Sequence, residues 1–358
     1  TSPFLAEAFV STDKHGKKAS IAVVRATFDV RADGSATVSD IQTPFVFADM
    51  HYGDPAATSV QCESDFVPIK PNPEILLNAS AVAPAGKPVE QVEVSLFGPG
   101  LRKQAIVTGE RFWTRGFLGI VSTPPMPFHS LPLAWHLAFG GADRSHKSPN
   151  HHGCELRNPI GTGFHINPSA ETIVGLALPC VEHPHHRMHS WSDTPEPIGF
   201  GPVSRFARSR VRFAGTYDQE WMDAILPFLP TDFDEHYFQA APEDQQFHSL
   251  EAGTEFMCLN MSLEKKFTMR LPTLNVAVNF LFDHKTYRKL IKPDTLIIEP
   301  HEKRIILLGR ASVDLPRKFT RLREIVVEQQ ARSSNSERIR YKNLANTVND
   351  ETGFTEGA

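Results

Sequence analysis

Short apolar runs separated by turn residues recur along this chain, and they predict β-strands. Residues 20–30 are rich in apolar and β-branched side chains, and the Asp-Gly turn at 33–34 predicts a hairpin with 37–47 as the returning strand. Residues 90–98 alternate between polar and apolar side chains, as a half-buried strand does. The same criteria predict strands or strand pairs at 104–115, 209–218, 254–262, 266–272, 274–282, 294–300 and 304–311.

The segment 209–218 carries a specific expectation about its two faces. Alternation along the predicted strand puts Arg210 and Arg212 on one face. It puts Val211 and Phe213 on the other face.

Helical spacing stands out in one segment, 218–229. Trp221, Ala224 and Ile225 fall at positions i, i+3 and i+4, which predicts a short amphipathic helix that Pro227 ends. We expect Trp221 to anchor the next element in the core. Its replacement by alanine would then lower the free energy of unfolding by about 3–5 kcal/mol.

The spacing of proline and glycine along the chain indicates its fold class and organisation. The 28 prolines and 22 glycines are scattered, which is typical of many short strands and turns. The sequence therefore predicts a mainly β protein of two packed β-sandwich or barrel-like units, with long loops and few short helices. We expect an N-terminal β-rich unit at 1–120, a loop-rich Pro/Gly/His segment at 121–202, a C-terminal β-rich unit at 203–330 and a polar, disordered tail at 331–358.

Composition argues against several classes of partner. The net charge is −4 and the pI is about 6.5, so no overall positive field would attract nucleic acid or an anionic membrane. The longest apolar stretches are too short for a membrane span, and the first residues lack the features of a signal peptide. The four cysteines form no CxxC pair, as expected of reduced thiols. We expect a cytoplasmic protein without a nucleic-acid or membrane partner.

Acidic residues are concentrated in the segment 216–264. It holds eleven carboxylates and no Lys or Arg, and a cluster of arginines precedes it at 205–212. One interpretation is that these charges pair with each other in the fold. The other is an acidic docking surface for a basic partner, which would speed association more than it would raise affinity. Pro230 predicts a loop just before Asp232, Asp234 and Glu235, so we expect these three to be exposed and to bind the partner.

Histidines are the strongest suggestion of chemistry in the chain. Ten of the sixteen fall in one stretch: His129, His136, His146, His151, His152, His165, His183, His185, His186 and His189. Zinc binds imidazole, thiolate and carboxylate groups of this kind. However, the zinc-finger spacing and the HExxH motif are both missing, and Pro184 disfavours a regular helix. We therefore expect no tight metal site here.

Catalytic motifs are also missing from the sequence. It has no GxSxG nucleophile elbow and no phosphate loop, and the short GTGF at 161–164 is no dinucleotide fingerprint. Asp232 and Asp234 form a DxD pair, but in a turn such residues commonly cap the backbone. We expect no catalytic residue and no cofactor. A metal-dependent hydrolase built on the His and Asp residues remains the alternative.

Several stretches together resemble one bacterial family. They include TGERFW at 108–113, LPLAWHLAFGGAD at 131–143, PEPIGFGPVSRFARSRVRFAGTYDQEW at 195–221 and LPTDFDEHYFQAAPEDQ at 229–245. These stretches run in the order of a domain family of unknown biochemistry that occurs beside type VI secretion genes and is proposed to be an effector adaptor or chaperone.

The resemblance implies a cytoplasmic protein that binds a toxin, the effector, and helps to load it onto the secretion spike through a VgrG or PAAR component. Such a protein would bind without catalysing a reaction. A structural component of the secretion machinery is a further alternative.

Overall fold

The computed structural model describes residues 3–117, 119–166, 169–315, 321–329 and 338–341. The protein is mainly β, with several sheets and few short helices, which confirms the predicted class. The strands predicted at 90–98, 254–262, 266–272 and 274–282 are all present.

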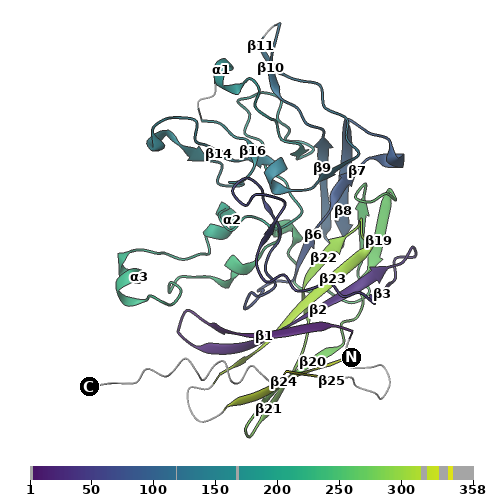
Figure 1. Ribbon diagram of the computed structural model, residues 1–358, viewed down its shortest axis with the longest axis vertical. Helices are drawn as coiled ribbons and strands as arrows, with labels where there is room; N and C mark the ends of the chain where they lie inside the picture. Colours follow the sequence, from purple (N-terminus) through teal and green to yellow (C-terminus); the bar gives the residue numbers. More distant parts are fainter. Residues whose placement is uncertain (1–2, 118, 167–168, 316–320, 330–337, 342–358) are drawn as a thin grey trace.

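The largest sheet has six strands and crosses the middle of the molecule (Figure 1). Its members are β1 (Leu5–Thr12), β2 (Lys18–Val30), β3 (Ala36–Val38), β6 (Glu74–Leu77), β22 (Pro293–Glu299) and β23 (Arg304–Asp314). The order is β1-β2-β23-β22-β6, with β3 paired to β2, and only β22 and β6 are parallel among these pairs of described strands. Segments from both ends of the chain therefore share one sheet.

Two further sheets lie against the first. The five-stranded sheet, in the order β17-β9-β8-β18-β19, consists of β8 (Gln91–Gly98), β9 (Leu101–Thr108), β17 (Val181–Glu182), β18 (Glu255–Leu259) and β19 (Lys266–Arg270). The four-stranded sheet, in the order β21-β20-β24-β25, consists of β20 (Val276–Phe282), β21 (Thr286–Leu290), β24 (Leu322–Gln329) and β25 (Arg338–Tyr341).

One apolar core joins the three sheets. It includes Phe28 of β2, Leu96 of β8 and Phe280 of β20, all buried. On its other face β2 contributes Val23 to a second cluster with Ile306 of β23. Burial on both faces explains why residues 20–30 are a continuous apolar run and not an alternating one.

The middle of the chain forms long loops held by short strand pairs. The short strands of the molecule are β4 (Met50–His51), β5 (Val60–Cys62), β7 (Ser80–Val82), β10 (Trp113–Gly116), β11 (Gly119–Ser122), β12 (Ser130–Pro132), β13 (Phe139–Gly140), β14 (Ala142–Asp143), β15 (Gly153–Cys154) and β16 (Thr162–Gly163). Trp113, Phe139 and Met188 form a separate small core under these loops.

The helices are short, and two of them lie in a projecting segment. They are α1 (Ala170–Ile173), α2 (Arg208–Val211) and α3 (Gln219–Ala224), with 3-10 turns η1 (Pro84–Gly86), η2 (Trp135–Leu137), η3 (Pro149–His151), η4 (Glu235–Phe238) and η5 (Glu243–Gln245). We call residues 205–238 the arm, because α3 extends away from the sheets (Figure 1), and the remaining described residues the body. Within the described ranges, every helix is too short and too polar to cross a bilayer.

The strand predicted at 209–218 is wrong. Residues 208–211 form α2, and the chain then turns at Gly215, where φ is +80°. The two arginines also do not share one environment, since Arg210 is buried whereas Arg212 is exposed, and Val211 between them is 47% exposed. Arg210 is buried because it meets a buried carboxylate from a distant segment, and this overrides the local alternation.

Two other segments differ from their predictions. The returning strand predicted at 37–47 ends at Val38. Beyond it, the side chain of Gln42 takes the place of a strand backbone and forms the hydrogen bonds to Thr27. Gln42 Oε1 accepts from the Thr27 N–H at 2.8 Å, and Gln42 Nε2 donates to the Thr27 carbonyl at 3.0 Å. In the tail predicted to be disordered, residues 338–341 pair with β24 as strand β25, and 331–337 and 342–358 lie outside the described residues.

Candidate functional site

Helix α3 forms the outer part of the arm because its sequence supplies a start and a stop. The Asp218 carboxylate accepts a hydrogen bond from the Trp221 N–H at 2.9 Å, which caps the first turn. Pro227 follows shortly after the last helical residue and cannot continue the helix. The helix predicted within 218–229 is thereby confirmed. All six of its residues are at least partly exposed.

Trp221 does not lie in the core, contrary to the prediction. Its side chain is half-buried within the arm, where Nε1 donates to the Phe228 carbonyl at 2.9 Å. Its ring stands edge-on to Tyr217, with 4.8 Å between centroids. Because the helix packs on the arm's own returning segment, its apolar stripe never reaches a sheet. Trp221 is therefore a partly buried residue of the arm and no part of the core.

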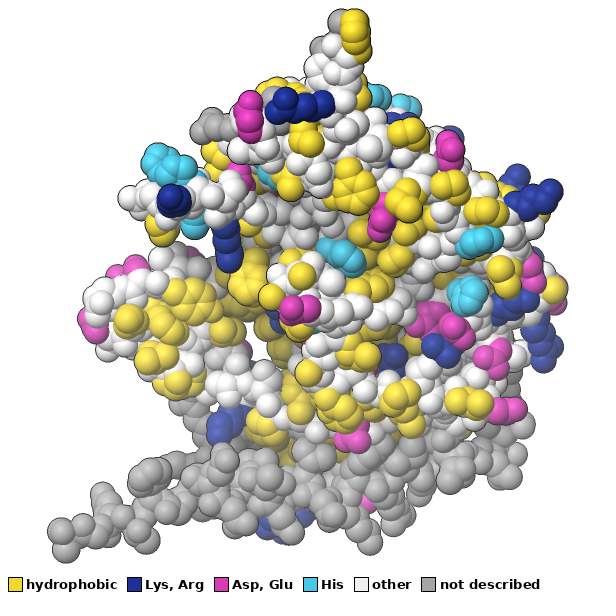
Figure 2. All heavy atoms as spheres, turned by 45° about the horizontal axis from the view of Figure 1, so that its top comes forward, with side chains coloured by type: hydrophobic (Ala, Val, Ile, Leu, Met, Phe, Trp, Pro, Cys, Tyr) yellow, Lys and Arg dark blue, Asp and Glu magenta, His cyan; other side chains and the backbone are white. Residues whose placement is uncertain are grey.

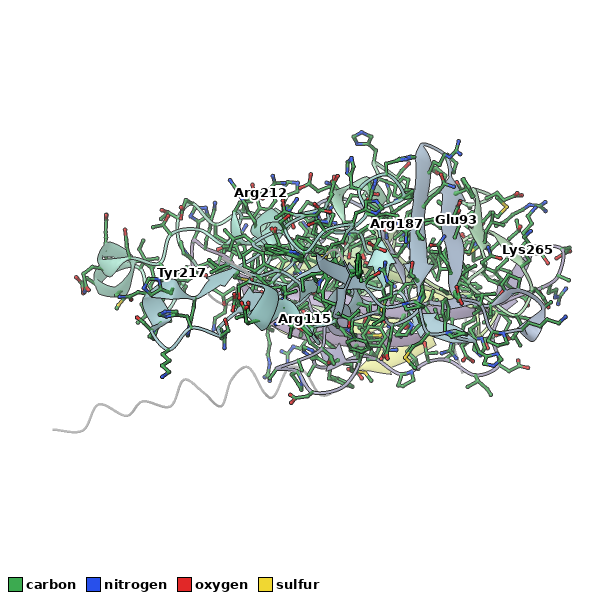
Figure 3. The ribbon with its side chains drawn as sticks, turned by 90° about the horizontal axis from the view of Figure 1, so that it is seen from above. Glu93, Arg115, Arg187, Arg212, Tyr217 and Lys265 are labelled. Atoms are coloured by element: carbon green, nitrogen blue, oxygen red, sulfur yellow. The ribbon has the colours of Figure 1, made fainter. Side chains whose placement is uncertain are left out.

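The arm concentrates exposed apolar side chains. Among the described residues, six of the 22 exposed large hydrophobic side chains lie in these 34 positions, with exposures between 42% and 78%: Phe206, Val211, Tyr217, Met222, Leu226 and Phe228. Figure 2 shows this apolar surface on the arm with acidic side chains around it. Figure 3 places Tyr217 far out along the arm and Arg212 nearer to the body. A contiguous apolar surface of this kind is typical of a binding site.

A groove separates the arm from the tip of the β1–β2 hairpin. It has a volume of about 780 Å³ and is lined by the hairpin residues 11–17, the loop at 68–71 and the returning segment of the arm at 229–238. The two walls touch at the tip, where Lys14 Nζ donates to the Phe233 carbonyl at 2.8 Å. Gly16, at φ +74°, allows close approach, since a Cβ there would lie 3.1 Å from the Phe228 ring.

The three predicted partner-binding residues lie together on this groove. Asp232, Asp234 and Glu235 are exposed and line it, as does Lys14 opposite them. Asp232 accepts from the N–H and hydroxyl of Thr216, at 2.9 and 2.8 Å, and these bonds hold the pKa of Asp232 below its usual value. Asp232 therefore caps a turn, as Asn and Asp residues commonly do, and its carboxylate lies on the rim of the groove together with that of Asp234.

Asp234 is held in its ionised form as well. Its carboxylate accepts from the His236 N–H at 2.8 Å and from the His236 ring at 2.6 Å. These bonds, the backbone one foremost, lower the pKa of Asp234. Both aspartates therefore carry full charge at neutral pH.

The acidic segment 216–264 divides into two parts. All eleven acids are exposed, but four of the five beyond the arm form ion pairs with Lys or Arg: Glu243 with Arg212, Asp244 with Lys103, Glu255 with Arg270 and Glu264 with Lys303. Of the six on the arm, the described ion pairs include only Asp234, paired with His236. The arm's acids therefore present their charge to solvent.

A buried arginine fixes the root of the arm. Arg210 forms an ion pair with the buried Glu63 and donates to the Val203 carbonyl at 2.9 Å. It also donates to the Tyr237 carbonyl at 2.9 and 3.1 Å. One guanidinium thus links the two ends of the arm to the body. Arg210 therefore anchors the arm, Arg212 pairs with Glu243, and the described ion pairs join none of the arginines at 205–212 to Asp232, Asp234 or Glu235.

The histidines are spread over several loops, and one group is compact. His183, Pro184, His185 and His186 form what we call the histidine turn. Potential ligand atoms of His183, His186 and Glu196 all lie within 4.8 Å of one another. Elsewhere His146 and His151 have ring centroids 4.3 Å apart, and His136 contacts the Ser59 hydroxyl at 3.0 Å.

Several residues of the groove were missed by the sequence analysis. The hairpin tip with Lys14 and Gly16 carries no motif, and it is more than 200 positions from Phe233 in the chain. The sequence did carry a signal for three exposed apolar residues of the arm outside the groove, Met222, Leu226 and Phe228. They lie in or just after α3, a helix of only six residues, and one face of so short a helix cannot bury all of them.

Residues 15–310 match one family model, DUF2169, described as an uncharacterized protein conserved in bacteria. No curated protein and no solved structure matches the chain. The matched range contains the arm, the groove and the histidine turn. Since it covers most of the 358 residues, the chain belongs to the bacterial DUF2169 family.

Proposed function

We propose that this protein is a type VI secretion adaptor or chaperone, which binds an effector and helps to load it onto a VgrG or PAAR component of the spike. The observation that carries the proposal is the exposed apolar arm beside an acidic groove. Exposed apolar surface lowers solubility unless a partner covers it. A chaperone needs such a surface to hold the apolar segments of its cargo.

The charges on the arm define the chemistry of the cargo segment. Asp218, Glu220 and Asp223 on α3 and the three acids of the groove surround the apolar side chains. A segment with apolar anchors and flanking Lys or Arg complements this pattern. The apolar contacts would supply most of the affinity, and the carboxylates would steer the encounter.

The proposal is tested by co-purification from cells that express the protein together with the effector and spike genes beside it. We expect the effector to be retained by the native chain and lost from the Met222→Asp/Leu226→Asp variant, because both side chains are about half exposed and need no refolding of the body.

A matched variant keeps this test specific. Ile41→Asp/Leu263→Asp changes two apolar residues of the body that are even more exposed, and it should retain the effector. Loss of the effector from both variants, or from neither, would contradict the proposed binding surface. Turnover of a substrate by the native chain would instead favour the hydrolase. A stable place in the assembled apparatus after effector release would favour a structural component.

A further inference from the structure

A tight turn brings two histidines face to face. The His186 N–H donates to the His183 carbonyl at 3.2 Å, and the two residues form an antiparallel bridge. Residues paired in this way project their side chains to the same side. Their ring centroids lie 4.7 Å apart with an angle of 23° between the planes. Pro184 disfavours a helix here, but it suits the second position of a turn, so it promotes the pairing of the imidazoles.

A carboxylate completes the group. Glu196 Oε2 lies 3.4 Å from His186 Nδ1, which is roughly the spacing of two ligands around a tetrahedral zinc ion. Pro195 and Pro197 flank Glu196 and restrict its backbone, and Pro195 and Ile198 are buried. Small side-chain rotations are therefore enough to bring the three ligand atoms around one ion.

The base of the turn is fixed to the body. Glu182, at the end of β17, is buried and accepts from the Met188 N–H at 2.9 Å and from Arg111 Nη2 at 2.8 Å. Arg187 reaches the Thr108 hydroxyl of β9 at 3.2 Å, and Figure 3 shows it beside the strands of the body. The residues on either side of the histidine turn are thus held in place, which favours a preorganised ligand set.

One backbone hydrogen bond orients the His183 ring. The His185 N–H donates to His183 Nδ1 at 3.2 Å, and a metal ion bound at Nδ1 would take the place of this donor. Imidazoles bind metals in their neutral form. Two of them with one carboxylate therefore supply one negative charge, which complements a divalent cation.

We propose that His183, His186 and Glu196 bind one divalent transition-metal ion, best matched by zinc, and leave a coordination position open. Nitrogen ligands favour zinc and its neighbours over magnesium, calcium or manganese. Three protein ligands with a fourth, open position are the arrangement of exchangeable zinc sites. Water or a side chain of a bound protein can occupy the open position.

Calorimetric titration of the untagged full-length chain with zinc tests the site. We expect one equivalent to bind, and each of His183→Ala, His186→Ala and Glu196→Gln to weaken binding at least about tenfold. Pro184→Ala should weaken it less, because the ligands remain and only the turn loosens. Cobalt in place of zinc should give the strong visible absorption of a four-coordinate site.

Two control variants distinguish this site from general histidine binding. His185→Ala removes an imidazole from the same turn, and His146→Ala/His151→Ala removes the other close pair. Both should retain the affinity of the native chain. The proposal is overturned if zinc does not bind, if it binds equally after the three ligand changes, or if the His146/His151 change abolishes binding. His186 and Glu196 are more than half exposed, so their variants test the site even if His183→Ala fails to fold.

Discussion

The arm and the body use the same kinds of side chain in opposite ways. In the body, large apolar residues such as Phe280 and Leu96 are enclosed between sheets, and the acids of the 243–264 stretch mostly meet a Lys or Arg. On the arm, apolar residues face solvent and most acids have no basic partner among the described ion pairs. The body encloses most of these groups, whereas the arm exposes a larger share of them to solvent.

The exposed apolar side chains of the arm contribute less to folding than the enclosed side chains of the body. Burial of apolar surface stabilises a fold by about 25 cal/mol per Å², and the arm forgoes much of that gain. Its conformation depends instead on caps and on its root, above all Asp218, Asp234 and Arg210. The four predictions that follow test this difference.

The largest contrast is expected in thiol labelling. Burial raises the pKa of Cys258 to about 12, so at pH 8 only about one in ten thousand such thiols is ionised, against roughly a quarter of exposed thiols. A cysteine introduced by Leu226→Cys on the arm should therefore react at least about a thousandfold faster than Cys258. Mass spectrometry of labelled peptides measures both rates. Comparable rates in the native protein would show that the body is not closed.

Core and arm aromatics should differ in their effect on stability. Phe280→Ala should lower the free energy of unfolding by about 3–5 kcal/mol, because a buried ring leaves a cavity. Trp221→Ala should lower it by less than about 1.5 kcal/mol, since its ring is partly exposed and packs only within the arm. Chemical denaturation measures both. Equal losses would mean that the arm contributes to folding as the sheets do.

Changes at Arg210, the root of the arm, should affect the free energy of unfolding as much as changes in the body do. Arg210→Met leaves the buried Glu63 with only its longer contact to Arg205, at 3.6 Å, and should lower the free energy of unfolding by about 3 kcal/mol. Adding Glu63→Leu removes the poorly paired charge and should restore part of that loss. Denaturation of the single and double variants measures the difference. If the double variant is the less stable of the two, the ion pair is not what holds the arm.

The smallest effect is expected from the charges of the groove. Asp232→Asn/Asp234→Asn/Glu235→Gln should slow association with the effector about two- to tenfold at low salt and flatten its dependence on ionic strength. Stability should change by less than about 0.5 kcal/mol. The matched change Glu251→Gln/Glu255→Gln/Glu264→Gln removes the same charge from the body and should leave the rate nearly unchanged. A loss of stability without a change in rate would identify the groove acids as internal partners.

The sheets could be predicted from the sequence because local pattern and tertiary environment agree there. Residues 90–98 alternate since one face of β8 joins the core, and 20–30 do not alternate since β2 is buried on both faces. Where a distant group decides, the local pattern fails. Arg210 is buried by Glu63, 147 positions away, and no alternation within 209–218 could reveal this.

The candidate site was predicted only in part for the same reason. Exposure of Asp232, Asp234 and Glu235 followed from Pro230, a local signal. The groove itself needs the hairpin tip at 13–17, which the chain brings beside the arm only when β1 and β2 pair. The sequence did not show that His183 and His186 face each other, because helical and zinc-finger spacings do not describe two residues that meet across a proline turn.

The linkage through Arg210 has a consequence for variation in length. Because one side chain holds both Val203 and Tyr237, the chain between them leaves and re-enters the body at nearly the same point. A loop closed in this way tolerates insertions, since doubling its length adds only about 0.6 kcal/mol of closure entropy. We therefore expect the segment from 212 to 234 to tolerate changes in length while the register of the three sheets stays unchanged.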